Sequence, residues 1–326
     1  MIRVPYKEIL FMKGRFAPSP TGYIHLGNVW IALLSYISTR NQHGTYVVRM
    51  EDIDLQRSKR SLGEALLDDL EWLGFEWDEG PRVGGPELSY WQSERLPMYD
   101  EVLQRLEDTD LIYPCFCNRT RLQSIASAPH RGEVVHHYDG HCRDLDSATV
   151  RLKRLEKNPS MRIKVTDSTM EFNDIYQGPQ HFVLRQGVDD FVLRRGDGMY
   201  AYNLAVVLDD IAMGVTEIIR GHDLLETTAQ QMYLYSTLQS EPPCYGHAPL
   251  LIDNDGHRLS KRQKSITVKE LKELGWSAER ILGELAVLAG FIPKCDAPSI
   301  SLKSLLTYTA RTEELRCEHI VLKKSI

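Results

Sequence analysis

Residues 15–28 read RFAPSPTGYIHLGN and join an expected strand, residues 10–16, to an expected helix, residues 24–40. Pro18 and Pro20 break the strand, because proline lacks the backbone N–H that a sheet needs. Apolar side chains then recur at helical spacing, at Leu26, Trp30, Leu33, Leu34 and Ile37. The segment therefore predicts a strand, a tight turn and the beginning of an amphipathic helix near His25.

Two residues of this turn point to its chemistry. Free backbone N–H groups and the positive end of the helix dipole favour a phosphate at such a junction. His25 in the first helical turn can donate to phosphate oxygens, and Gly27 leaves room for a flat ring against the helix. Taken alone, a His-x-Gly pattern is more often a proline-rich turn with a helix-capping histidine, since so short a pattern is common by chance.

The rest of the chain predicts an α/β fold with a doubly wound parallel sheet. A strand over 45–50 and a helix over 62–73 follow the first helix, and strand-helix alternation is typical of parallel sheets. After an interruption, we expect a hairpin over 191–201, a helix over 202–213, a strand over 215–220, a helix over 224–238 and short helices over 268–274 and 278–289. We expect four regions: residues 1–112 and 188–265 as two halves of one catalytic domain, 113–187 as an insertion, and 266–326 as a helical segment.

Composition excludes several classes of protein. The chain has 326 residues, of which 42% are apolar and 26% charged, which rules out fibrous and wholly disordered proteins. No run reaches the roughly 18 apolar residues of a membrane span. Lys7, Glu8 and Lys13 stand where a signal peptide would need an apolar core. We expect a soluble, cytoplasmic protein with no membrane contact.

The charge is distributed unevenly. The net charge of -6 argues weakly against a nucleic-acid partner, yet residues 51–110 hold 17 acidic and 6 basic side chains, while 143–164 hold 7 basic and 3 acidic. Residues 258–272 hold 6 basic and 1 acidic. Because phosphate affinity depends on local patches, the total does not exclude RNA. A basic run is equally typical of a solvated face.

A second motif, RLSKR at residues 258–262, precedes the terminal helices. Alone it is more often an exposed basic turn. Paired with the first motif, it supplies what adenylate transfer needs, because positioning and charge stabilisation on the phosphates carry the rate of that reaction. Lys261 is the residue we expect to follow the migrating charge.

In three segments, residues 15–27, 202–220 and 258–262, the chain resembles the class I aminoacyl-tRNA synthetases, and within them the glutamyl branch. The resemblance implies a Rossmann-type catalytic domain with an acceptor-binding insertion, ATP with Mg²⁺ as co-substrate, and L-glutamate activated as its adenylate. It implies catalytic roles for His25 and Lys261 and ATP contacts from His25, Gly27 and Lys261. It also implies a glutamate site formed by Arg15, Ser19, Glu51, Tyr202 and Arg220. An arginine guanidinium can form two parallel hydrogen bonds with a carboxylate, and anionic Glu51 attracts the α-ammonium group.

Length discriminates within the branch. Enzymes that charge glutamate tRNA continue into a helical anticodon-binding region, and only 61 residues follow residue 265 here. The chain is more similar to the shorter glutamyl-queuosine tRNA(Asp) synthetases, which implies transfer of glutamate to queuosine in the anticodon loop of tRNA(Asp). Val206, where charging enzymes commonly carry asparagine, favours the same family. A truncated enzyme charging the tRNA 3′ end and a catalytically silent RNA-binding module are the alternatives, and we expect a monomer.

A cysteine cluster lies within the expected insertion. Cys115, Cys117 and Cys142 suit a closed tetrahedral Zn²⁺ site with one further ligand, although three reduced thiols without metal are the alternative. The residues themselves favour a histidine as the fourth ligand, with His130, His136, His137 and His141 within reach. The resemblance instead implies Tyr138, as in the shorter family's structural zinc site of three cysteines and a tyrosine.

Basic residues flank the cysteine cluster. They are Arg119, Arg121, Arg143, Arg151, Lys153 and Arg154. In an insertion ordered by zinc they form an expected docking surface for the tRNA backbone.

Overall fold

A four-stranded parallel sheet lies at the centre of the protein, in the order β2-β1-β8-β9. The computed structural model describes residues 11–118, 120–122, 138–253, 266–294, 298–308 and 313–322. The strands are β1 (Lys13–Phe16), β2 (Thr45–Val48), β8 (Glu217–Gly221) and β9 (Cys244–Ala248). All neighbouring strands pair in parallel, which confirms the predicted sheet type.

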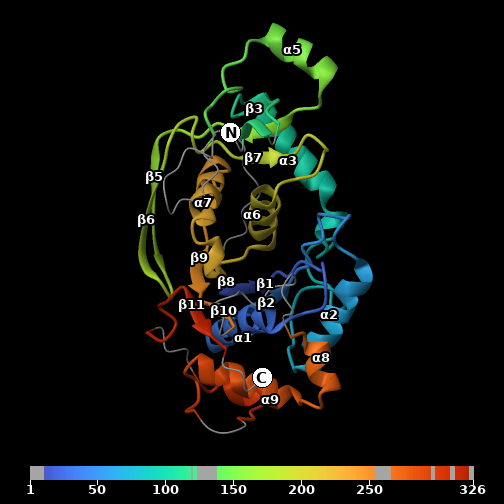
Figure 1. Ribbon diagram of the computed structural model, residues 1–326, viewed down its shortest axis with the longest axis vertical. Helices are drawn as coiled ribbons and strands as arrows, with labels where there is room; N and C mark the ends of the chain where they lie inside the picture. Colours follow the sequence, from blue (N-terminus) through green and yellow to red (C-terminus); the bar gives the residue numbers. More distant parts are fainter. Residues whose placement is uncertain are drawn as a thin grey trace.

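Helices cover both faces of this sheet, as Figure 1 shows. Helix α1 (Leu26–Asn41) lies on one face, and α6 (Tyr202–Met213) and α7 (Thr227–Thr237) lie on the other. Successive strand side chains point to opposite faces, so Tyr46 and Val48 pack in the core with α1 while Val47 packs in a second cluster. The doubly wound arrangement predicted from the sequence is therefore confirmed.

Gly14 shows how closely α1 lies on β1. A Cβ atom at Gly14 would come within 1.9 Å of the Thr39 Oγ1 atom of α1. A larger residue at this position would have to displace the Thr39 side chain or the helix that carries it. This close packing fixes the position of α1 and of the turn that leads into it.

A second region extends from the sheet towards the top of Figure 1. It contains α3 (Leu96–Asp108), the antiparallel strands β3 (Ile112–Cys115), β4 (Ser160–Ile163) and β7 (Val192–Arg194), and α5 (Ser147–Glu156). Helix α5 projects from the rest and buries none of its residues. The hairpin expected over 191–201 forms only in part: Arg194 and Tyr200 make one isolated bridge, and β7 pairs with β4 instead.

A long hairpin runs back from this region to the central sheet. Strands β5 (Ser168–Asp174) and β6 (Gly178–Leu184) pair antiparallel and lie beside α7 and β9 (Figure 1). At its turn, the Gln177 Nε2 atom donates to the backbone oxygen of His247 at 2.7 Å. The hairpin thus packs directly against the strand at the sheet edge.

Two short 3-10 helices join these regions: η1 (Gln92–Glu94) contacts α3, and η2 (His222–Leu224) follows β8 and contacts β9. The remaining elements are α2 (Arg60–Trp72), β10 (Leu250–Ile252), α8 (Val268–Glu273), α9 (Ala278–Leu288), α10 (Leu302–Leu305) and β11 (His319–Val321). Helices α8 and α9 lie at the end of the molecule opposite α5 (Figure 1). The predicted helices over 62–73, 268–274 and 278–289 are confirmed, with ends shifted by one or two residues. Among the residues described here, no helix is long and apolar enough to cross a membrane.

Candidate active site

A cavity of about 340 Å³ opens at the carboxyl ends of the parallel strands, where open α/β sheets bind ligands. The structure brings seven of the predicted site residues into its lining: Arg15, Ser19, His25, Gly27, Glu51, Tyr202 and Arg220. Asp223 adds a carboxylate that the sequence did not single out. Val206, by contrast, is buried in the apolar cluster of α6 and α7. Lys261 lies outside the described residues.

The turn after β1 is held against the next strand by backbone hydrogen bonds. The Arg49 N–H donates to the Phe16 oxygen at 3.0 Å, and the Glu51 N–H donates to the Pro18 oxygen at 2.9 Å. The second of these bonds draws Glu51 to the side of the cavity formed by residues 15–19. The two residues joined by each bond are more than 30 positions apart in the sequence.

His25 caps helix α1 from the wall of the cavity. Its backbone N–H lies 3.4 Å from the Asn28 Oδ1 atom, and its backbone oxygen accepts from the Asn28 and Val29 N–H groups. His25 also forms an isolated antiparallel bridge with Thr267, the second residue described after the segment that contains Lys261. Leu250 and Leu251, shortly before that segment, line the cavity as well.

A buried ion cluster lies directly beneath the cavity. The fully buried Arg49 guanidinium lies 2.7 Å from the Asp210 carboxylate, 3.3 Å from Glu51 and 3.5 Å from Asp209. The Arg15 Nε atom contacts the same Asp210 oxygen at 3.4 Å. Sequence reasoning missed Arg49, Asp209 and Asp210. Their signal is that charged residues stand at positions where β2 and α6 are otherwise apolar and buried.

The cluster sets the charge of the groups that face the ligand. Burial would raise the pKa of Asp210, but the Arg49 and Arg15 guanidiniums bring that pKa below its usual value. Burial raises the pKa of Glu51, and Arg49 offsets only part of this rise. Asp210 is thus a fixed anion that orients two arginines, whereas Glu51 is the carboxylate of this site that protonates more readily on acidification.

Arg220 reaches the cavity from β8 with its guanidinium already oriented. Its Nη1 atom donates to Gln231 Oε1 at 2.6 Å, its Nη2 atom to Thr228 Oγ1 at 2.8 Å, and its Nε atom to His247 Nε2 at 2.9 Å. Each Nη nitrogen carries two hydrogens, so these bonds do not exhaust the donors of the guanidinium. The Arg220 Nη2 atom also contacts the Leu224 backbone oxygen at 3.5 Å, so the guanidinium is held in one orientation at the cavity wall.

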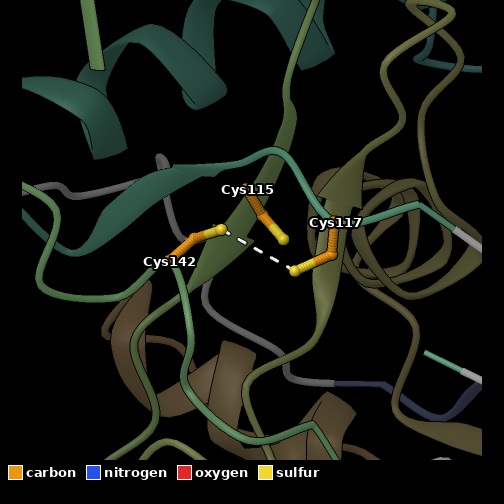
Figure 2. A group of neighbouring side chains, drawn as sticks. All are labelled: Cys115, Cys117 and Cys142. Carbon is orange, nitrogen blue, oxygen red and sulfur yellow. Dashed lines mark hydrogen bonds between the residues drawn. The ribbon is translucent and has the colours of Figure 1, made fainter. Parts of the chain in front are cut away.

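The three predicted metal-ligating cysteines come together at the other end of the molecule (Figure 2). Their Sγ atoms all lie within 4.8 Å of one another, and those of Cys117 and Cys142 are 3.7 Å apart. Two thiolates on one tetrahedral Zn²⁺ ion, at 2.3 Å each, are separated by about 3.8 Å. A shared hydrogen bond lowers the pKa of Cys115 and raises that of Cys142, so a metal ion would have to displace the proton of Cys142 to bind both sulfurs. The cluster fits a metal ion.

The Tyr138 hydroxyl lies beside these thiols. Its hydroxyl oxygen lies 3.5 Å from Cys115 Sγ and accepts from the Cys142 N–H at 2.8 Å. The Arg162 guanidinium lies 4.1 Å from the centre of the Tyr138 ring. His141 is exposed beside Cys117 and Cys142, whereas His130, His136 and His137 lie outside the described residues.

The basic residues expected to contact RNA have different surroundings in the structure. Arg143 is held by Asp190 at 2.6 and 2.7 Å, and Arg121 forms two hydrogen bonds with Asp139. Both arginines therefore have structural partners. Three others, Arg151, Lys153 and Arg154, lie on the projecting helix α5, and Arg119 lies outside the described residues.

Comparison with known proteins decides the family. A family model described as "tRNA synthetases class I (E and Q), catalytic domain" matches residues 12–324. The chain belongs to this family of ligases. The resemblance expected from residues 15–27, 202–220 and 258–262 is thus confirmed, as is the class I catalytic domain with its parallel, Rossmann-like sheet.

Within the family, the chain is similar over most of its length to two proteins named Glutamyl-Q tRNA(Asp) synthetase. It is 44% identical to the protein from Nitratidesulfovibrio vulgaris, covering 92% of this chain and 94% of that protein. It is 45% identical to the protein from Symbiobacterium thermophilum, covering 86% and 87%. A glutamate tRNA ligase structure from Elizabethkingia meningosepticum, in complex with its amino acid, aligns with a TM-score of 0.79 at 28% identity. This chain covers only 66% of that structure.

Proposed function

We propose that this protein activates L-glutamate with ATP and transfers the glutamyl group to queuosine in the anticodon loop of tRNA(Asp). The observation that carries the proposal is the match over nearly the whole length of two proteins named for this activity. We further propose that the protein acts as a monomer, with residues 1–112 and 188–265 as the catalytic domain and 113–187 as an insertion.

The charges of the cavity support glutamate as the amino acid. Arg15 and Arg220 match the two carboxylates of glutamate, and Glu51 matches its ammonium group. We propose Ser19 and Tyr202 as the neutral ligands that complete the site. Glutamine would leave one guanidinium without an anionic partner, so the pairing selects against it.

ATP, with Mg²⁺, would lie beside glutamate at the amino end of α1. His25 and the helix dipole face this position, and Gly27 offers space for the adenine ring. Lys261 precedes Thr267, which bridges to His25, by six residues in the sequence. We propose that Lys261 stabilises the negative charge that develops on the phosphates during adenylate formation.

In the insertion, we propose that Cys115, Cys117, Cys142 and Tyr138 hold a structural Zn²⁺ ion. A closed site of four protein ligands stabilises a fold without taking part in the reaction. The Tyr138 oxygen supports this ligand set because it already contacts the thiols. Burial and the hydrogen bond with Cys115 raise the pKa of Tyr138, so a metal ion bound here would have to displace the phenol proton.

Helix α5 is the part of the insertion that we propose binds the tRNA backbone. It carries Arg151, Lys153 and Arg154 and buries no side chain against the protein. The exposed basic side chains of such a helix are accessible to a large polyanion. Phosphate contacts supply most of the non-specific affinity for RNA.

The decisive experiment is labelling with radioactive glutamate and ATP, using tRNA(Asp) with and without queuosine. We expect label only on the queuosine-containing tRNA. A second sample of that tRNA, trimmed of its terminal adenosine, should be labelled equally, because the proposed acceptor is not the 3′ end. Labelling that ignores queuosine, or that is lost with the terminal adenosine, contradicts the proposal in favour of 3′ charging.

Activation is tested separately by ATP–pyrophosphate exchange. We expect exchange driven by glutamate and not by glutamine, and its loss in Lys261→Ala. A protein that binds tRNA without any exchange would be a silent RNA-binding module. Normal exchange in Lys261→Ala would contradict the role given to that lysine.

A further inference from the structure

The parallel register places His247 beside Arg220. The two residues pair across β8 and β9, so their side chains leave the sheet on the same face. The Arg220 Nε–H donates to the His247 Nε2 atom at 2.9 Å. His247 is fully buried, and its ring lies nearly parallel to that of Tyr245, with centroids 6.0 Å apart.

This contact fixes the tautomer of His247. A guanidinium N–H can only donate, so the Nε2 atom must be the unprotonated acceptor, and the proton of a neutral imidazole must be on Nδ1. The Nδ1 atom lies 2.5 Å from Asp174 Oδ2, which accepts that proton. Burial lowers the pKa of His247, and this favours the same neutral form. The contacts on both sides of the ring therefore agree.

Asp174 is itself held rigidly by the end of the β5–β6 hairpin. Its Oδ1 atom accepts from the backbone N–H groups of Tyr176, Gln177 and His247 at 3.0, 2.9 and 3.0 Å. These bonds fix one carboxylate oxygen to the hairpin turn and leave the other for the His247 ring. The carboxylate that orients the imidazole thus comes from a segment far from the catalytic motifs in sequence.

We propose that Asp174 and His247 are positioning residues that orient the Arg220 guanidinium for glutamate, so that the β5–β6 hairpin contributes to the amino-acid site. The inference rests on the proposed role of Arg220 as a glutamate ligand. Neither positioning residue lines the cavity. Their effect is to hold the Nε edge of Arg220, so that its Nη groups keep the orientation that a carboxylate requires.

Asp174→Asn is the most informative variant because it preserves shape. An amide can offer its oxygen either to the three backbone N–H groups or to the ring, but not to both. With the NH₂ group towards the ring, His247 must protonate on Nε2, and a donor then faces the Arg220 donor. With the amide reversed, the NH₂ group faces three N–H donors. We expect a rise in KM for glutamate on the order of tenfold, without a matching rise in KM for ATP.

Two variants of His247 separate positioning from packing. His247→Phe keeps a ring but removes the acceptor, so it should raise KM for glutamate like Asp174→Asn. His247→Gln places an oxygen near the position of Nε2 and should recover most of that loss. Glu171→Gln, an exposed change on the same strand β5, is the matched control and should behave like the wild-type protein. Equal KM rises for ATP and glutamate, or no rise in Asp174→Asn, would overturn the inference.

Nitrogen NMR of labelled histidine tests the same inference without activity. At pH 7 the wild-type His247 should show a protonated Nδ1 and an unprotonated Nε2, and Asp174→Asn should change this pattern. The opposite tautomer, or an imidazolium, in the wild-type protein would refute the positioning role of Asp174 and His247 even if glutamate activation is established. If glutamate drives no exchange at all, the proposed function fails instead, whatever tautomer is observed.

Discussion

Replacing Arg49 with methionine tests the buried cluster beneath the active site. Arg49 is fully buried and lies within 3.5 Å of three carboxylates, those of Glu51, Asp209 and Asp210. Methionine approximates the length of the side chain without its charge. The change therefore removes one positive charge and little volume, so its effect isolates electrostatics from packing.

The expected magnitude follows from the charges that remain. Three buried arginines, Arg15, Arg49 and Arg95, lie among three buried carboxylates, and Arg95 also contacts the partly exposed Glu87. Among the buried groups, the variant therefore leaves one more carboxylate than arginines. Removing one partner of a buried ion pair typically costs about 3–5 kcal/mol. Asp209 retains three partners, but Glu51 and Asp210 lose their shortest ion pairs. At about 2–4 °C per kcal/mol, the midpoint of unfolding should fall on the order of 10 °C.

Thermal unfolding at pH 7 and pH 5 measures this effect. An uncompensated buried carboxylate has a raised pKa, and its penalty disappears as it binds a proton. The difference between Arg49→Met and wild type should therefore shrink at pH 5. Arg105→Met, which removes the exposed partner of Glu101 on α3, is the control and should change stability by less than about 1 kcal/mol. Equal losses in both variants, or a larger loss at pH 5, would refute the reasoning.

Three further outcomes follow from the structure. Metal analysis should find one zinc ion per chain, lost in Cys117→Ala but retained in the control Cys317→Ala; zinc in both variants would contradict the ligand set. Because the pKa of Glu51 is raised, this carboxylate should protonate at a higher pH than an ordinary carboxyl, and KM for glutamate should rise on acidification. Glu51→Gln should have a high KM for glutamate that depends less on pH. If its KM depends on pH as in the wild-type protein, Glu51 is not the titrating group. Gly14→Ala should lower the free energy of unfolding by about 1–3 kcal/mol, because its Cβ atom clashes with Thr39. The double variant with Thr39→Ala should recover part of this stability. If the two substitutions lower stability additively, the clash is not the cause.

Much of the central fold could be predicted because its signals are local. Helix α6 has the bounds expected from its apolar periodicity, and α2 ends just before Gly74, whose φ of +89° suits the glycine expected there. Helix α3 and strand β9 were not predicted. Strand β9 reads CYGHA, whose glycine and histidine conceal a strand that is buried by its neighbours. The partner of β7 was also missed, because strand pairing depends on contacts distant in sequence.

The candidate site likewise contains residues that the sequence predicts and residues that only the structure identifies. The residues that motifs identify, such as Arg15, His25 and Arg220, line one cavity, because the turns after parallel strands converge at one edge of a sheet. The residues that support them carry no motif. Burial and hydrogen bonding identify Arg49 and His247 as supporting residues. The sequence offers only a weak signal for Arg49, a charged residue directly after an apolar strand, and none for His247.

The family, the parallel sheet and the polar groups that line the cavity could be predicted from residue type, local periodicity and short spacing. How those groups are held depends on the folded chain. The strand register set Arg220 against His247, a distant hairpin supplied Asp174, and β2 placed Arg49 beneath the cavity. Orientation and ionisation depend on burial and on partners far along the chain, and both arise only when the chain has folded.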